Sequence, residues 1–258
     1  MMRHLHFIAF LVCLLLVPLP IVSADDWKEY KQTHFIIYYK DAPKDFVKTV
    51  EDSAEKYYNE IARNLGFTRY KGWTWEERAK IYIYDDQETY ISSGQAGWSH
   101  GAASPERKII KTFPAAHGFF DSTLPHEIGH LVFREFIGYD TYVPRWFEEG
   151  VAMQQEKAKR WGAHKQVQKY LKDNSFRSLS KLGVGFLRRA TQEDVELFYT
   201  ESASIVSYLI QEHGKHRFSQ FCRKLKSGTP FEIALGQTYS RFDSIEKLNE
   251  AWVKFLKK

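Results

Sequence analysis

The hydrophobic pattern of this chain changes its period once, near residue 123, and that change limits the folds open to it. Before this point, three runs rich in β-branched and aromatic residues are bounded by polar turns and predict strands. The runs are 34–39, 80–85 and 108–113. Between the first two, apolar residues recur every three or four positions from Phe46 to Leu65 and stop at Gly66, which predicts a helix. The first half is therefore expected to be α+β.

The second half of the chain has helical periodicity throughout. The expected helices are 123–137, 144–160, 163–172, 192–213, 215–226, 229–239 and 243–257. Turn residues such as Gly162 are expected to separate them. Because no internal repeat, low-complexity tract or flexible linker interrupts the chain, we expect one domain of residues 25–258. A small mixed sheet in residues 25–121 would pack on a mainly helical half, residues 122–258, with a cleft between them.

The first 24 residues have the features of a secretory signal peptide. Arg3 gives a basic start, an apolar run covers 7–22, and Val22, Ser23 and Ala24 form a small-residue cleavage site. The alternative is an uncleaved membrane anchor, since the apolar run approaches spanning length. We expect removal of the segment, a secreted or periplasmic mature protein, and no stable membrane insertion afterwards.

The composition is that of an ordinary globular protein, with 258 residues, 43% hydrophobic and 27% charged. The formal net charge of +5 becomes 5 − 1 = +4 once Arg3 is removed, and the excess is spread along the chain. Such a distribution does not indicate a nucleic-acid partner. Cys222 would be the one cysteine of the mature chain, so no intrachain disulfide can form, and its apolar neighbours predict a packed thiol.

A His-Glu-x-x-His pattern at His126, Glu127 and His130 falls on the first helix of the second half. Positions i and i+4 share one face of a helix, so both imidazoles can reach one zinc ion. Glu127 points elsewhere, where a carboxylate can take a proton from the attacking water. The alternative is a pair of packed, hydrogen-bonded structural histidines.

A catalytic zinc site needs a third protein ligand, with the fourth position left open. A third histidine would have to stand at position 136, where the chain has Phe136. Two adjacent acids, Glu148 and Glu149, lie on the next expected helix. Glu149 is next to the apolar stripe that starts at Trp146, whereas Glu148 is rotated about 100° from it. We therefore expect His126, His130 and Glu149 to bind the metal.

The spacing of these residues resembles that of the gluzincin zinc metallopeptidases. Eighteen residues separate His130 from Glu149, and Glu149 lies in a Trp-x-x-Glu-Gly-x-Ala segment, residues 146–152. The pattern looks most like the small peptidase-MA-like relatives of the gluzincin aminopeptidases. The resemblance implies a thermolysin/gluzincin-like catalytic domain, one zinc ion and a peptide or protein substrate.

The same resemblance implies a role for Tyr199. In that family, a tyrosine nine residues before a Tyr-Leu pair donates a hydrogen bond to the tetrahedral oxyanion, and Tyr199 precedes Tyr208 and Leu209 in this way. From periodicity alone, Tyr199 shares a face with Ala203 and is typical of a packed core residue. The resemblance favours the catalytic interpretation.

The resemblance also places Gly101 and Ala102 at the start of an edge strand that aligns the substrate backbone. The gluzincin aminopeptidases follow this pair with a glutamate that grips the free amine of the substrate, whereas this chain continues with 103–105, Ala-Ser-Pro. An endopeptidase is therefore favoured. The alternatives are an aminopeptidase and a catalytically silent zinc-binding or protein-interaction module of the same fold.

Other residues near the expected ligands differ from the pattern of the family or are further candidates for the site. Thermolysin-like members have an aspartate four residues after the third ligand, which orients a zinc-bound imidazole, and this chain has Met153 there. Gln154 and Glu156 are the alternatives for that role. His100 and His117 flank the expected edge strand and are either transition-state donors or extra ligands at the site, or surface or packed residues.

Overall fold

The structure is a computed structural model that describes residues 27–67, 72–97, 99–114, 118–183 and 190–258. The predicted signal peptide, residues 1–24, and His117 lie outside the described residues, so the predictions made for them stay predictions. The strands are β1 (Lys28–Lys31), β2 (Phe35–Tyr39), β3 (Ala79–Ile83), β4 (Gly101–Ser104) and β5 (Ile109–Thr112). The helices are α1 (Lys44–Asn64), α2 (Gln87–Ser92), α3 (Leu124–Ile137), α4 (Arg145–Met153), α5 (Lys157–Lys172), α6 (Gln192–Gln211), α7 (Lys215–Lys226), α8 (Phe231–Tyr239) and α9 (Ile245–Leu256).

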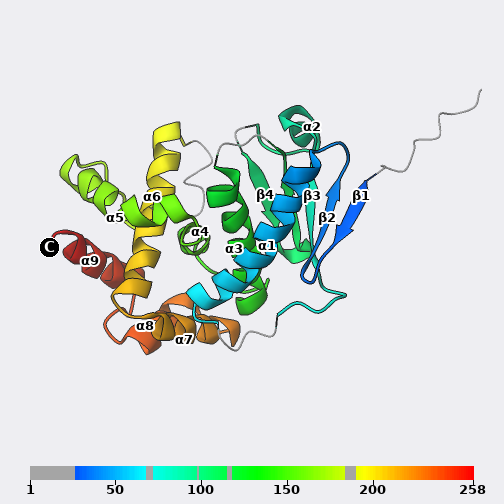
Figure 1. The fold of residues 1–258 in the computed structure, drawn as a ribbon. Helices are drawn as coiled ribbons and strands as arrows, with labels where there is room; N and C mark the ends of the chain where they lie inside the picture. The colour runs from blue at the N-terminus through cyan, green and yellow to red at the C-terminus, as the bar shows by residue number, and fades with distance from the viewer. Residues whose placement is uncertain (1–26, 68–71, 98, 115–117, 184–189) are drawn as a thin grey trace, which may run out of the picture.

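The five strands form one sheet in the order β1-β2-β3-β5-β4. β2, β3 and β5 are parallel to one another, and the outer strands β1 and β4 run antiparallel to their neighbours. The predicted α+β class, with a small mixed sheet followed by a mainly helical half, is confirmed (Figure 1). The free edge of β4 lies beside α3, on the side where the helical half begins.

Alternating burial in the central strands fixes which face of the sheet is covered. Phe35 and Ile37 of β2 and Ile81 and Ile83 of β3 are fully buried, while the residues between them are partly exposed. The helix α1, which follows β2 and precedes β3 in the chain, crosses this face of the sheet, as Figure 1 shows. Its buried stripe, which includes Val50, seals the first half of the core.

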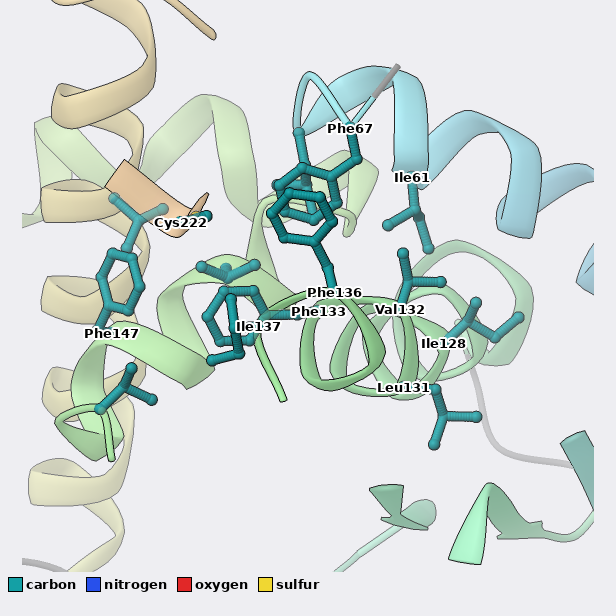
Figure 2. Close-up of a cluster of buried hydrophobic side chains, with 14 of the residues drawn as sticks. Ile61, Phe67, Ile128, Leu131, Val132, Phe133, Phe136, Ile137, Phe147 and Cys222 are labelled. Carbon is teal, nitrogen blue, oxygen red and sulfur yellow. The ribbon is translucent and has the colours of Figure 1, made fainter. Parts of the chain in front are cut away.

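The central helix of the domain is α3, in which every residue is buried or only partly exposed. Figure 2 shows Ile128 and Val132 pointing towards Ile61 of α1, while Phe136 stacks on Phe67 with ring centroids 3.7 Å apart. On other sides α3 contacts β4, α4 and α7. A helix buried all round is held in one position by its neighbours, so the residues on it are placed rigidly.

The helical half differs from the sequence expectation between residues 144 and 172. One helix was expected over 144–160, but α4 ends at Met153 and α5 begins at Lys157. The three residues between them, 154–156, are polar yet buried, and each side chain forms a hydrogen bond within the domain. The expected break at Gly162 is wrong, because α5 continues through this glycine. None of the helices in the described ranges has the length and apolarity that a membrane span needs.

Candidate metal centre

Two helices, α3 and α4, carry the candidate ligands, α6 packs against α4, and glycines allow the close approach of all three. On α3, an added Cβ at Gly129 would lie 3.1 Å from Ala152 Cα of α4. On α4, an added Cβ at Gly150 would lie 2.5 Å from Val206 Cγ2 of α6. Any side chain at these two positions would push the helices apart, so both glycines set the spacing on which the site depends.

The donor atoms of His126, His130 and Glu149 form one compact group. The two Nε2 atoms are 3.1 Å apart, and each lies 3.5 Å from Glu149 Oε2. Ligands at about 2.0–2.2 Å from a tetrahedral ion lie about 3.3–3.5 Å from one another, so these spacings fit a single zinc ion with a fourth position open. The structure therefore brings together the three residues that the sequence pointed to as metal ligands.

The charges around the two imidazoles favour a cation. Burial opposes protonation of His126, but hydrogen bonds with the carboxylates of Glu149 and Glu156 outweigh it and raise its pKa to about 9. Burial likewise opposes protonation of His130, and Glu148 and Glu149 raise its pKa to about 10. Burial also opposes ionisation of Glu149, but both imidazoles hold its pKa well below the usual range. Such an excess of carboxylates is the environment that a divalent ion requires.

Outer residues hold both imidazoles in place. Glu156 Oε1 accepts a hydrogen bond from His126 Nδ1 at 2.9 Å, and Ser122 Oγ bonds to the other oxygen of Glu156. Of the two alternatives left by the sequence, Glu156 occupies the orienting position, because Gln154 Nε2 donates to the Ala203 carbonyl instead. Glu156 is only 2% exposed, so this carboxylate has little access to bulk water.

Glu148, the acid rotated away from the stripe, also has a place beside the site. Its Oε1 lies 3.6 Å from His130 Nδ1 and accepts a hydrogen bond from Arg134 Nε at 2.7 Å. A second contact joins Arg134 Nη2 to Glu148 Oε2, so the pair is bidentate. Burial raises the pKa of Glu148, but His130 and Arg134 lower it overall to about 2, which keeps the carboxylate ionised.

Glu127 faces a cleft of about 620 Å³ that also contains the three ligand side chains. Its side chain is nearly buried, and burial raises the pKa of its carboxyl against the opposing charges of His126 and His130. Gly101 of β4 lies directly over it, since an added Cβ would be 2.6 Å from Thr123 Cγ2 and 3.6 Å from Glu127 Oε1. Only a glycine lets the strand come this close.

Tyr199 of α6 also lines the same cleft. Its ring centroid is 6.4 Å from that of His126, and its packing partners are Met153 and Ala203. Burial is the main cause of a raised pKa for its hydroxyl, with Glu149 adding to it, so the hydroxyl stays protonated at neutral pH. Both interpretations of Tyr199 from the sequence are thus compatible with its position, because it is packed on one side and open to the cleft on the other.

The remaining predicted residues divide between the cleft and the rest of the molecule. Ala102 and His100 line the cleft with Gly101. Arg145 also lines it, with Nε 3.4 Å from Glu149 Oε1, and the sequence analysis missed this residue. Its place one helical turn before Glu149 is a signal that could have found it. No local signal identifies Ser122, because its partner Glu156 is 34 residues away.

The α+β fold, the helix-borne triad and the cleft together define a metallopeptidase-like protein. The family model described as the Peptidase MA superfamily matches residues 66–258, and the chain belongs to that superfamily. The match covers α3, α4 and α6, which carry all of the candidate ligands and both candidate catalytic residues. No curated protein matches the chain.

Proposed function

We propose that this protein is a zinc-dependent endopeptidase of the gluzincin type that acts outside the cytoplasm. The single observation that carries the proposal is the spacing of His126, His130 and Glu149, which suits one tetrahedral zinc ion, in a cleft that also contains Glu127. Membership of the Peptidase MA superfamily supports a peptidase over other zinc hydrolases.

Glu127 and Tyr199 would act on opposite sides of the scissile bond. When bound, zinc polarises the scissile carbonyl and lowers the pKa of water. The Glu127 carboxylate takes the proton from the attacking water and passes it to the leaving nitrogen, which breaks the C–N bond. The raised pKa of Glu127, caused by its burial, suits a group that must hold and release a proton. The Tyr199 hydroxyl donates a hydrogen bond to the oxygen on which negative charge develops.

The edge of β4 supports binding of an extended peptide. β4 pairs with β5 on one side only, so the backbone groups of Gly101 and Ala102 can add the substrate as a further strand. The cleft has no acid in the place where an aminopeptidase needs one, since 103–105 is Ala-Ser-Pro and Glu106 is not among the residues that line it. Internal cleavage is therefore the favoured mode.

The extracytoplasmic location rests on the sequence of residues 1–24 alone. Expression of the full chain in a secreting host, followed by N-terminal sequencing of the exported product, tests it. The expected first residue is Asp25. A product that stays in the cytoplasm would contradict the proposal, and an exported product that retains Met1 would identify residues 1–24 as an uncleaved anchor.

The activity is tested with the mature zinc-loaded chain and an unfolded protein substrate. Cleavage is expected, a chelator should abolish it, and zinc should restore it. Peptides with a free or an N-acetylated terminus should be cleaved at similar rates, because internal cleavage does not need the amine. Resistance of the acetylated peptides would instead identify an aminopeptidase. Zinc binding without cleavage of any substrate in a diverse peptide library would identify a silent module.

A further inference from the structure

The last helices of the chain enclose a second cavity, of about 820 Å³, away from the metal centre. We call it the C-terminal cavity; it is lined by the ends of α6, α7 and α8, by residues 240–242 and by α9. Tyr199 and Tyr208 both lie on α6, nine residues apart, which separates the cleft from this cavity by about 14 Å along the helix axis. The cavity therefore has no part in the proposed peptidase reaction.

The rim of the C-terminal cavity carries a surplus of positive charge. Five basic residues line it, and two acidic residues, Glu212 and Glu250, accompany them. The basic residues are Arg217, Arg241, Lys247, Lys254 and Lys258. Lys247 pairs with Glu250 at 3.1 Å, but within the described ranges the side chains of Arg217 and Arg241 have no ion-pair partner. The two guanidinium groups are therefore free to bind an anion.

The floor of the cavity is aromatic and contains two polar atoms without partners. The rings of Tyr208, Tyr239 and Phe242 surround His213, with centroids 5.2, 5.4 and 5.3 Å from its ring. His213 Nε2 and the Tyr239 hydroxyl are buried and form no hydrogen bond within the described part of the chain. Both residues contribute ring surface to the cavity, so its floor offers a flat aromatic lining to the apolar part of a ligand.

The positive charges of the rim affect the pKa values of the residues in the floor. Burial lowers the pKa of the His213 imidazole, and the charges of Arg217 and Arg241 lower it further. Burial and the neighbouring Cys222 raise the pKa of the Tyr239 hydroxyl, and the charge of Arg217 opposes them. Both guanidinium groups therefore act on the same imidazole, that of His213. His213 is neutral at neutral pH and can donate or accept a hydrogen bond there.

We infer that the C-terminal cavity binds a small ligand that carries a phosphate on an aromatic or apolar body, with Arg217 and Arg241 holding the phosphate. Guanidinium groups match the oxygens of a phosphate with paired hydrogen bonds, and a dianion balances the surplus of positive charge on the rim. The aromatic floor, formed by the rings of Tyr208, Tyr239 and Phe242, holds the organic part of the ligand. The site does not depend on the metal centre.

The test is calorimetric titration of the zinc-loaded protein with phenyl phosphate, in parallel with phenol and with inorganic phosphate. Phenyl phosphate should bind more tightly than either, because it alone has both parts of the ligand. The double variant Arg217→Gln/Arg241→Gln should weaken its binding at least tenfold while leaving peptide cleavage unchanged. Both arginines are exposed and unpaired, so the variant is expected to fold normally.

Two controls separate this site from nonspecific and metal-centred binding. Arg223→Gln removes an exposed arginine of α7 that does not line the cavity, and should leave the affinity unchanged. His130→Ala removes a metal ligand and should also retain binding of phenyl phosphate. The inference is overturned if phenol or inorganic phosphate binds as tightly as phenyl phosphate, if the double variant keeps full affinity, or if His130→Ala abolishes binding.

Discussion

Glu156 Oε1 lies 2.9 Å from His126 Nδ1, on the side of the imidazole opposite the nitrogen that faces Glu149. The carboxylate comes from the short connection between α4 and α5, seven residues after Glu149. It fixes the orientation of the ring and favours the tautomer that leaves Nε2 free to bind a metal. The connection between two helices is thus part of the metal centre.

Replacing Glu156 with glutamine should weaken zinc binding. Glu156→Gln keeps the size of the side chain but removes the charge that supports His126, and loss of such outer partners costs about 10–100-fold in metal affinity. Competition with a chelator of known affinity measures the change. Glu196→Gln, an exposed position of α6, is the matched control. Equal zinc affinity of Glu156→Gln and wild type would show that Glu156 does not support the ligand.

Removing the hydroxyl of Tyr199 should slow the chemical step without affecting substrate binding. Tyr199→Phe keeps the packing against Met153 and Ala203, and loss of one oxyanion donor lowers kcat by about 100-fold. Steady-state kinetics should show KM within about threefold of the wild-type value. A change in KM alone, with kcat retained, would assign Tyr199 to the substrate pocket instead.

The contact between α4 and α6 predicts different effects for two glycines. Gly150→Ala would place a Cβ 2.5 Å from Val206 Cγ2 and should lower the free energy of unfolding by about 1–3 kcal/mol. Gly162 lies in α5 with nothing within 4 Å of an added Cβ, so Gly162→Ala should raise it by up to about 1 kcal/mol. Urea denaturation measures both. Equal effects in the two variants would contradict the close helix contact.

The sequence predicted the helices and strands that have a regular hydrophobic period. It did not predict the elements and breaks that depend on contacts between residues distant in the chain. The strand β1 has four exposed residues and no apolar alternation, so only its pairing with β2 reveals it. The helix α2 does have a local signal, the mutual capping of Asp86 and Thr89, which was overlooked. The break between α4 and α5 depends on partners of Gln154 and Glu156 that are distant in sequence.

The candidate site was predictable to the extent that its chemistry follows from short spacings. His126 and His130 are one helical turn apart, and the choice of Glu149 over Glu148 follows from the apolar stripe on its helix. Arg134 could not be assigned to the site, because its bond to Glu148 joins two helices whose approach only the structure reveals. Spacing in the sequence thus identifies the candidate metal ligands, and only tertiary packing identifies the residues that hold them in position.

The carboxyl of Glu201, buried in α6, should make stability depend on pH. Burial raises its pKa to about 8, against the opposing hydrogen bond from the Arg177 backbone N–H. An unfolded glutamate has a pKa of about 4.3. Between this pH and the pKa of the folded state, the folded chain therefore holds one proton more than the unfolded chain. Its contribution to stability is fully present below about pH 4 and is lost as the pH rises through about 8.

Glu201→Gln mimics the protonated acid and should remove this dependence. The variant should gain stability relative to wild type by about 1 kcal/mol per pH unit between pH 5 and pH 8. Urea denaturation across this range measures the difference, and Glu196→Gln serves as the exposed control. Parallel pH profiles of wild type and Glu201→Gln would show that Glu201 ionises normally in the folded chain.

The most direct test of the zinc-peptidase account combines zinc content and cleavage rate in Glu127→Gln. Glu127 is not a member of the ligand triad, so the variant should retain one zinc ion per chain, as measured by elemental analysis. Its rate on an unfolded protein should fall at least 100-fold, because the group that accepts the proton from water is gone. Cleavage at the wild-type rate by zinc-loaded Glu127→Gln would contradict the account.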